Sequence, residues 1–577
     1  MKRNHIILIF ILAVSGIFGS CRKDFLDVKP AGGLNQFVLA TGDGIDALLI
    51  GAYSMLDGVS SQFGWESASS NWLYGSIRGM EANKGTDAGD SPTFNAIQNF
   101  SETAANIWST SYLEVKWREV YEAISRCNNV ILVTYQALAE GNIDQDQADS
   151  YLKQARALRG WYHFEAWRMW KMIPWVDEKT DPATVTNTDD IRPKIIADLQ
   201  EGTTLPDNMG AVGRFNGTVV KVLLAKSLMQ MNHDYTGALP LLQDAKNGTK
   251  PDGSPIGLAP TYGEIFDIVN RNGIEAIYTV QYSVNDGSGG WNAGWGEVLN
   301  FPYKTGGSPG GCCGFYQPTQ EFVNSFRTSS GLPLLDHSYN NAPVKSDYGI
   351  AVSAPFTEDT APLDPRLDWT VGRRGIPYWD WGIHTGSDWI RDQSYAGPYS
   401  PKKQVYKKSD EGKYTEVGNW TSGWTANGYR MIRYADILLL LAECQIETGD
   451  LAGALANINL IRARAANPAG FVKESDGITP AATYNIKPYV SFPDVEYARK
   501  ALRMERKLEL GMEGHRWFDL NRWGITVTEL NRALAYEKSM PWGNAMYGNA
   551  FVGPEDVTFP IPQSQIDMSQ KRLVQNR

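Results

Sequence analysis

The sequence predicts a mainly α-helical protein that carries a large irregular insertion. Two regions, residues 103–172 and 190–247, place apolar residues at the three- and four-residue spacing of long amphipathic helices. Residues 430–465 and 492–523 show the same pattern. Between these blocks, residues 250–425 are rich in Gly, Pro, Trp, Tyr and Asp and contain few periodic runs of helical length. We therefore expect a helical scaffold that is interrupted by loops with short strands.

The chain begins with the features of a bacterial export signal. Two basic residues precede an apolar run at 6–14, which is far shorter than the ~20 residues that span a bilayer. Cys21 then follows small residues, as in a lipobox, although Phe18 replaces the usual aliphatic residue. We expect residues 1–20 to be a signal peptide and 21–33 a tether acylated at Cys21, with several acyl chains giving a stable anchor. The alternative is an ordinary secretory signal beside an incidental cysteine.

Charge and linker content limit the partners and the domain number. Without residues 1–20, the chain has 577 − 20 = 557 residues, with 54 − 2 = 52 basic and 64 acidic side chains, a net charge of −12. This acidic balance argues against binding to nucleic acid or to an anionic membrane surface, so we expect membrane attachment through the lipid anchor only. Because no long Pro-, Ser- or Gly-rich linker divides the chain, residues 34–577 are expected to form a single domain.

The region 435–465 has the features of a tetratricopeptide repeat. Small residues at Ala442 and Ala454 would let two helices approach closely, and Gly449 with Asp450 would form the turn between them. Weaker forms of this pattern occur at 224–238 and in the pair 117–138 and 147–170. Each could also be a generic antiparallel helix pair. The repeats are scattered along the chain, so we expect a scaffold with insertions and not a tandem array.

Five segments together resemble the SusD/RagB family, in the order in which the family has them. They are residues 21–27, 156–175, 435–465, 505–523 and 559–563. The resemblance spans nearly the whole chain, and the segment 513–523 beside a lipobox is its most specific part. It implies a scaffold of about four tetratricopeptide-like helix pairs at 103–247 and 430–523. It also implies a ligand-binding region at about 250–425, joined by a loop at 72–91.

The resemblance also implies a function. Proteins of this family are lipid-anchored in the outer membrane, face the extracellular side, and capture oligosaccharides during polysaccharide utilisation. They deliver the ligand to a TonB-dependent, SusC-like transporter and are not enzymes. Three alternatives stay open for this chain: a binder of oligopeptides or another nutrient in the same kind of uptake system, a glycoside hydrolase, and a structural subunit that binds no ligand.

Aromatic residues in the loops are the candidate ligand contacts, because sugar rings lie flat on Trp and Tyr while their hydroxyl groups require polar partners. Trp291 and Trp295 lie among glycines, where no regular periodicity would bury them, and Tyr303 and Phe315 follow. The alternative role of these four residues is to pin a long insertion to the scaffold. A second candidate cluster contains Trp379 and Trp381. A third, at the place where the family often has a ligand-binding loop, contains Trp72, Arg78, Asn83 and Asp87.

No catalytic residue, cofactor or metal site is predicted from the sequence. The chain lacks a nucleophile elbow, a His-Glu-x-x-His helix, a phosphate-binding loop and a dinucleotide fingerprint, and it has only six histidines. Cys127 and Cys444 are expected to be packed thiols. Cys312 and Cys313 could close a vicinal disulfide or remain reduced. Few basic residues in the candidate loops slightly favour a neutral glycan over an anionic one.

Overall fold

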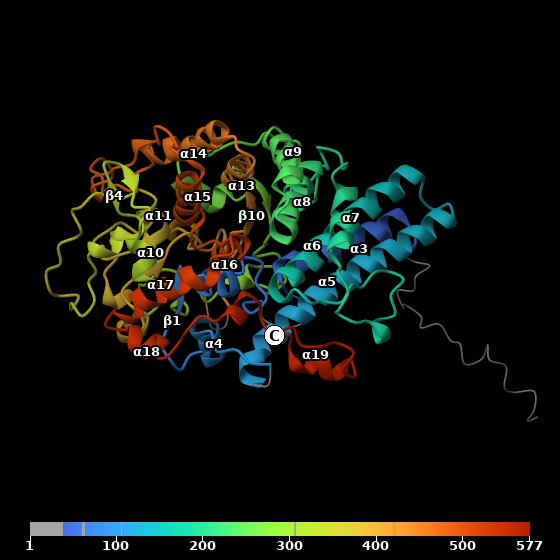
Figure 1. Ribbon diagram of the computed structural model, residues 1–577, viewed down its shortest axis with the longest axis horizontal. Coiled ribbons are helices and arrows are strands. Elements are labelled where there is room, and N and C mark those ends of the chain that lie inside the picture. The colour runs from blue at the N-terminus through green and yellow to red at the C-terminus, as the bar shows by residue number, and fades with distance from the viewer. Residues whose placement is uncertain (1–38, 60–63, 105–106, 305–306, 419–420, 422) are drawn as a thin grey trace, which may run out of the picture.

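The computed structural model describes residues 39–577 except 60–63, 105–106, 305–306, 419–420 and 422, and the side chains of 107–110 are also outside the description. Cys21, the predicted lipid anchor, lies outside the described residues. Long helices occupy one end and the upper middle of the molecule, while the loop-rich residues of about 300–400 lie at the opposite end (Figure 1). The predicted mainly α-helical fold with an irregular insertion is confirmed.

The first helical block forms a continuous row of packed helices. It contains α3 (Gly42–Ser54), α5 (Ile107–Ala139), α6 (Gln145–Trp170), α7 (Arg192–Gly202), α8 (Gly217–Asn232) and α9 (Tyr235–Lys246). Each helix from α5 to α9 packs against the next one, and α3 packs against α5 and α6. The predicted helical regions 103–172 and 190–247 therefore exist, each divided into shorter helices by turns.

The second block continues this row. It contains α13 (Tyr434–Glu447), α14 (Leu451–Ala465), α15 (Val495–Leu510), α16 (Arg516–Arg522) and α17 (Thr526–Lys538). Helix α13 packs against α9 of the first block and against α14 and α15 of its own. One boundary differs from the prediction, because residues 430–433 form a strand that pairs with a distant segment. Among the described helices, none has both the length and the apolarity that crossing a bilayer requires.

Side-chain caps explain where two of the paired helices begin. Asp450 accepts a hydrogen bond from the Gly453 amide at 2.8 Å and caps α14, and Gly449 enters this turn with a positive φ of 90°. Asp234 caps α9 in the same way through the Gly237 amide. Such caps satisfy amide groups that have no partner inside the helix. The two turns predicted from the repeat pattern therefore share one capping chemistry.

Short helices and strands lie in the insertion and in the segments that pack on it, and some of the strands pair across long sequence distances. The short helices of the insertion are α10 (Gln320–Asn324), α11 (Leu367–Thr370) and α12 (Gln393–Ala396). Outside it lie α4 (Asn95–Asn99), α18 (Gly543–Tyr547) and α19 (Gln563–Met568). Residues Trp72–Ile77 form a π-helical segment, η3. The strands are β1 (Ala82–Gly85), β2 (Ala276–Thr279), β3 (Phe315–Pro318), β4 (Thr328–Ser329), β5 (Leu332–Pro333), β6 (Val371–Gly372), β7 (Ser400–Pro401), β8 (Thr415–Glu416), β9 (Trp424–Thr425) and β10 (Arg430–Arg433). They form two-stranded antiparallel pairs, in which β1 joins β3 and β2 joins β10.

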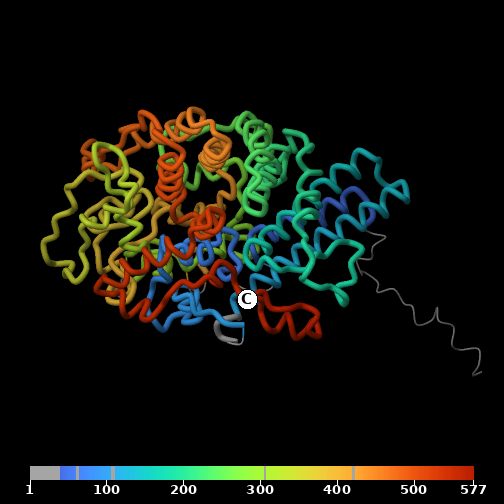
Figure 2. Tube along the Cα trace, in the orientation of Figure 1, coloured from blue at the N-terminus to red at the C-terminus, as the bar shows by residue number. Residues whose placement is uncertain are grey.

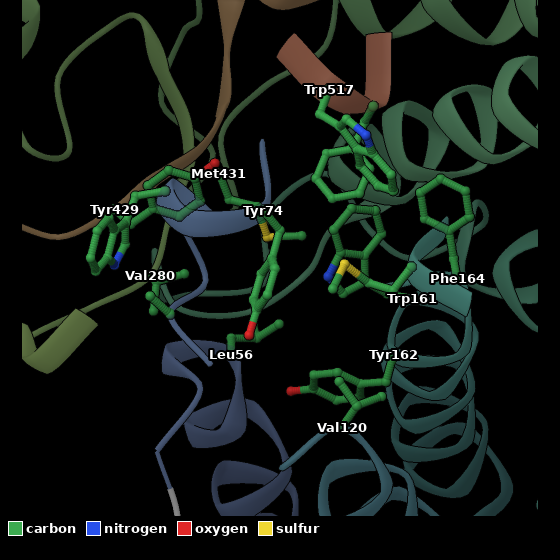
Figure 3. Packing of buried hydrophobic residues seen from close by; sticks show 14 of the residues in the cluster. Leu56, Tyr74, Val120, Trp161, Tyr162, Phe164, Val280, Tyr429, Met431 and Trp517 are labelled. Atoms are coloured by element: carbon green, nitrogen blue, oxygen red, sulfur yellow. The ribbon is translucent and has the colours of Figure 1, made fainter. Parts of the chain in front are cut away.

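Hydrophobic packing joins the two blocks and the insertion. One cluster of buried residues extends along the chain from Ala40 to Leu573. Trp161 and Tyr162 of α6, Met431 of β10 and Trp517 of α16 all belong to this core (Figure 3). The chain trace shows the same arrangement, since the C-terminal segments return across the middle of the molecule beside the N-terminal ones (Figure 2). The insertion thus packs on a scaffold that is made from both halves of the sequence.

Buried ion pairs also hold α15 and the segment after it in place. Glu505, Glu509 and Glu513 recur every four residues, so Glu505 and Glu509 lie on one face of the helix. Arg366 pairs with Glu505 at 2.6 Å, and Arg433 pairs with Glu513 at 2.7 Å. Neighbouring cations lower the pKa of Glu509 and Glu513 despite the opposing effect of burial. Glu509 and Glu513 are therefore ionised structural groups.

Candidate functional site

Three tryptophans packed against one another contain the most exposed aromatic ring among the predicted site residues. The rings of Trp291 and Trp295 have centroids 5.3 Å apart and planes inclined by 30°. The Trp295 ring in turn lies 5.0 Å from that of Trp424 in β9. Trp291 has 53% of its surface exposed, whereas Trp295 and Trp424 are buried. The buried pair supports one indole at the surface, and we call these three residues the tryptophan platform.

Local backbone chemistry keeps this platform in place. Gly290 has a φ of 84°, and a side chain there would place its Cβ 2.0 Å from the Trp424 ring, so only glycine fits. The Gly290 carbonyl accepts a hydrogen bond from the Trp295 indole at 2.9 Å. Beside it, Asp286 accepts hydrogen bonds from Ser288 and Asn292, which lower the pKa of its carboxyl group. A charged acceptor therefore lies close in sequence to the exposed ring.

A second surface group lies around Arg391. Its guanidinium carbon lies 5.6 Å from the centroid of the Tyr303 ring, and its Nε lies 3.0 Å from the Asp87 carboxylate. Burial opposes the ionisation of Asp87, but hydrogen bonds from the Asp90 and Gly89 amides and the charge of Arg391 lower its pKa. Tyr303 and Asp87 are both half-buried. Arg391 thus brings together Asp87 and Tyr303, two predicted site residues that lie far apart in the sequence.

The cysteine pair borders this second group. A disulfide joins Cys312 and Cys313 in the structure, and both residues are half-buried. At the next residue, Gly314, a Cβ would lie 3.5 Å from Arg391 and 3.6 Å from Tyr303. The amide of Cys313 donates to the Leu299 carbonyl at 2.9 Å. The cysteine turn is therefore attached to the loop that carries Tyr303.

Trp379 and Trp381 are half-buried and hold their loop to its neighbours. The Trp381 indole donates to the Tyr406 carbonyl at 2.8 Å, and the Trp379 indole donates to the Lys402 carbonyl at 3.3 Å. Trp379 also packs against Trp369, with ring centroids 5.2 Å apart. Because both indole N–H groups are used within the protein, only the ring faces remain for a ligand.

Packed aromatic rings connect these surface groups. The ring centroids of Phe301 and Tyr406 are 5.6 Å apart, and those of Tyr406 and Trp381 are 5.9 Å apart. A Cβ at Gly423, next to Trp424, would meet the Phe301 ring at 2.6 Å. The loops that carry the tryptophan platform, Tyr303 and Trp381 are therefore neighbours on one part of the insertion.

Four other predicted site residues are buried in the core. Trp72 is 1% exposed and makes edge contacts with Phe315, which is also buried. Arg78 is fully buried and pairs with Asp556 at 3.0 Å, and the Asn83 side chain donates to the Ala396 carbonyl at 3.0 Å. Their places follow from η3 and the β1–β3 pair, which bring residues 72–85 inside the fold. In this structure, their side chains pack inside the fold and do not reach the surface.

Trp424 is the platform residue that the sequence analysis missed. It lies in β9, which pairs with β8 so that Glu416 faces Trp424 in the register. The available signal was a tryptophan next to a glycine in a loop-rich stretch, as for Trp291. That signal does not reveal which distant loop the ring contacts.

Comparisons with known proteins agree with this architecture. The family model described as "SusD family" matches residues 274–577. SusD-like proteins P25 and P38 of Formosa agariphila are 23% and 24% identical, covering 99% and 90% of this chain and 97% and 92% of their own.

Solved structures share the fold at lower identity. A SusD superfamily protein from Bacteroides vulgatus has a TM-score of 0.63 at 18% identity, with 93% of this chain and 98% of that chain covered. A laminarin-binding SusD-like protein has a TM-score of 0.63 at 21% identity, with 93% and 99% covered. Surface glycan-binding protein A from Bacteroides thetaiotaomicron, solved with laminarihexaose, has a TM-score of 0.62 at 20% identity, with 93% and 99% covered. Because the family model matches more than half of the residues of this chain, the chain belongs to the SusD family.

Proposed function

We propose that this protein is a cell-surface glycan-binding lipoprotein that captures oligosaccharides at the tryptophan platform. The observation that carries the proposal is the exposed Trp291 ring, which is held by Trp295 and Trp424 beneath it. Covering this ring removes apolar surface from water, which favours binding of a ligand with an apolar face. The C–H face of a sugar ring is a suitable cover, since it is apolar while its hydroxyl rim can remain hydrated.

The platform would act by stacking, and polar groups nearby would set orientation. Trp291 needs little reorganisation on binding because its neighbours already fix the ring. The Arg391, Asp87 and Tyr303 group offers charged donors and acceptors and a second aromatic face on the same insertion. Burial of one aromatic face contributes a few kcal/mol at ~25 cal/mol per Å², most of which the desolvation of hydroxyl groups offsets. We therefore expect micromolar to millimolar affinity.

Two solved relatives suggest the first ligand to test. One is described as laminarin-binding and another was solved with laminarihexaose. Their identity to this chain is 21% and 20%, so the shared fold supports a glycan and leaves the sugar to experiment. We propose a neutral oligosaccharide of the laminarin class as the first candidate.

Membrane attachment and delivery belong to the same proposal. Membership of the SusD family and the lipobox-like Cys21 support a lipid anchor in the outer membrane, with the protein facing outward. A TonB-dependent, SusC-like transporter would receive the ligand. We propose capture without catalysis, because the tryptophan platform offers stacking surfaces and its acidic neighbour Asp286 is held by Ser288 and Asn292.

Calorimetric titration of the mature chain with laminarihexaose tests this function. We expect Trp291→Ala to weaken binding at least tenfold, which corresponds to about 1.4 kcal/mol. Phe551→Ala removes another exposed aromatic ring, 67% exposed and located near the C-terminal end, and should leave the affinity unchanged. Equal affinity of Trp291→Ala and the unaltered protein would reject the platform as the site. Release of shorter sugars during long incubation would show an enzyme, and absence of binding across a glycan array would reject glycan capture.

A further inference from the structure

A cavity of about 150 Å³ lies between α15, α17 and residues 335–339. Its wall carries the cationic side chains of Lys500, Arg503, Lys507 and Arg516, and one lining carboxylate, Glu529. The whole chain, in contrast, has a net charge of −10. Positive charge is therefore concentrated here against the overall balance, and we call this cavity the basic pocket.

The carboxylates at the basic pocket already have cationic partners. Glu321 pairs with Lys507 at 2.8 Å and with Arg532 at 2.7 Å. Glu529 pairs with Arg516 at 3.0 Å and with Arg532 at 2.8 Å. Lys507, Arg516 and Arg532 thus share the carboxylates Glu321 and Glu529. This group alone carries one net positive charge, apart from the other residues of the wall.

Arg503 adds to this excess, whereas Lys500 has a carboxylate partner of its own. The Arg503 guanidinium carbon lies 5.4 Å from the Trp523 ring centroid, and within the described residues no carboxylate lies within ion-pair distance of it. Arg503 is half-buried, and the loss of hydration lowers its pKa. Lys500 is exposed, and its amino group is 4.0 Å from Glu496. The charges of Glu496 and Glu443 act on Arg503 only from a distance, so an anion in direct contact would stabilise this half-buried guanidinium further.

A metal ion is the competing occupant, because ligand atoms of Glu321, His337 and Glu529 lie within 4.8 Å of one another. However, the two carboxylates accept hydrogen bonds from Lys507, Arg516 and Arg532. A divalent cation would have to displace these groups and would be repelled by their charges. The same arrangement attracts an anion.

We propose that the basic pocket binds a small oxyanion group, such as a sulfate or a carboxylate. Arg503 and Arg516 would donate paired N–H groups to its oxygens, and Lys507 would contribute a third charge from below. The cavity exceeds the room that a single water needs, and it suits one compact group better than a polymer. The group could come from a free ion or from an acidic sugar, and this site is independent of the tryptophan platform.

Calorimetric titration with sodium sulfate, sodium glucuronate and glucose, at constant ionic strength, tests the proposal. We expect saturable binding of sulfate or glucuronate and none of glucose, with sulfate alone indicating a free ion and glucuronate indicating an acidic sugar. Arg503→Gln should weaken this binding about tenfold, since one charge-assisted contact is lost. The matched control is Arg499→Gln on the same helix, whose side chain pairs with Glu447 outside the pocket and which should bind as the unaltered protein does.

Three results would overturn the proposal. The first is that neither anion binds saturably. The second is that Arg503→Gln binds as tightly as the Arg499→Gln control, which would place the anion elsewhere. The third is saturable binding of Zn²⁺ or Ca²⁺ that Glu529→Gln abolishes, since the pocket would then be a metal site. Loss of laminarihexaose binding in a platform variant does not affect this test, so the two proposals can fail separately.

Discussion

At the scale of single residues, Glu81 is a carboxylate that couples protonation to folding. It is buried at the end of the segment that follows η3, where it accepts hydrogen bonds from the Ser76 hydroxyl at 2.8 Å and the Met512 amide at 3.0 Å. Burial raises the pKa of Glu81 to about 7, because the charged form loses hydration that these two bonds only partly replace.

The expected consequence is a stability that decreases as the pH rises. With a folded pKa of about 7 and an unfolded value near 4.5, the native state binds the proton more tightly. The stability from this group is complete below pH 4.5 and is lost as the pH rises through 7. We predict that Glu81→Gln gains about 2.5 kcal/mol relative to the unaltered protein between pH 5 and pH 8, at 1.36 kcal/mol per pKa unit. Urea unfolding at both pH values measures this difference, and a difference that does not change with pH would contradict the assignment.

The candidate site residues show what can be predicted from the sequence about single residues. Trp291 was predicted from its glycine-rich surroundings, and the structure places it at the surface. Trp295 has the same surroundings but is buried, because Trp424 from a distant strand packs on it. Trp72 and Phe315 are buried together for a similar reason, since β1 pairs with β3. Local composition can identify aromatic residues as candidate site residues. Whether each of them is buried depends on packing partners that lie far away in the chain.

At the scale of elements, the shared turn chemistry of the helix pairs gives a direct test. Asp450 caps α14 through the Gly453 amide, and the cap orients α14 against α13. We predict that Asp450→Ala lowers the free energy of unfolding by about 1 kcal/mol, since one amide at the helix start loses its partner. Asp450→Asn keeps a capping oxygen and should lose less. Chemical denaturation of the three proteins measures the order, and an equal loss in both variants would show that charge, not capping, is what matters.

Long helices were predictable as elements, whereas short strands were not. The amphipathic spacing in 103–172 and 190–247 is local, so the corresponding helices could be identified from sequence. Residues 430–433 continue a pattern that suggested a helix, yet they pair with β2 and form a strand. Such a pair depends on a segment about 150 residues away in the chain, which is beyond the reach of any local pattern.

At the scale of the whole molecule, Glu513 connects the scaffold to the insertion. It follows α15, and its carboxylate receives Arg433 of β10 at 2.7 Å and Lys403 of the insertion at 2.7 Å. All three side chains are buried. Arg433 also reaches Glu275 and Glu509, so the cluster joins the second helical block to the insertion. Since the largest hydrophobic cluster also draws residues from both helical blocks and the insertion, we propose that residues 34–577 unfold as one unit.

Replacement of Glu513 by glutamine tests whether this carboxylate connects the scaffold to the insertion and whether residues 34–577 unfold as one unit. Glutamine keeps the shape but leaves Arg433 and Lys403 with less negative charge, and loss of one partner from a buried pair costs about 3–5 kcal/mol. Over a chain of this length, we expect a fall in Tm of roughly 3 °C, taking ~2.1 cal/mol/K per residue. Glu447→Gln is the matched control, because its pair with Arg499 is partly exposed and contributes about 1 kcal/mol or less. Differential scanning calorimetry should show one transition that moves as a whole in Glu513→Gln. Two transitions, of which only one moves, would show that the insertion folds separately from the scaffold.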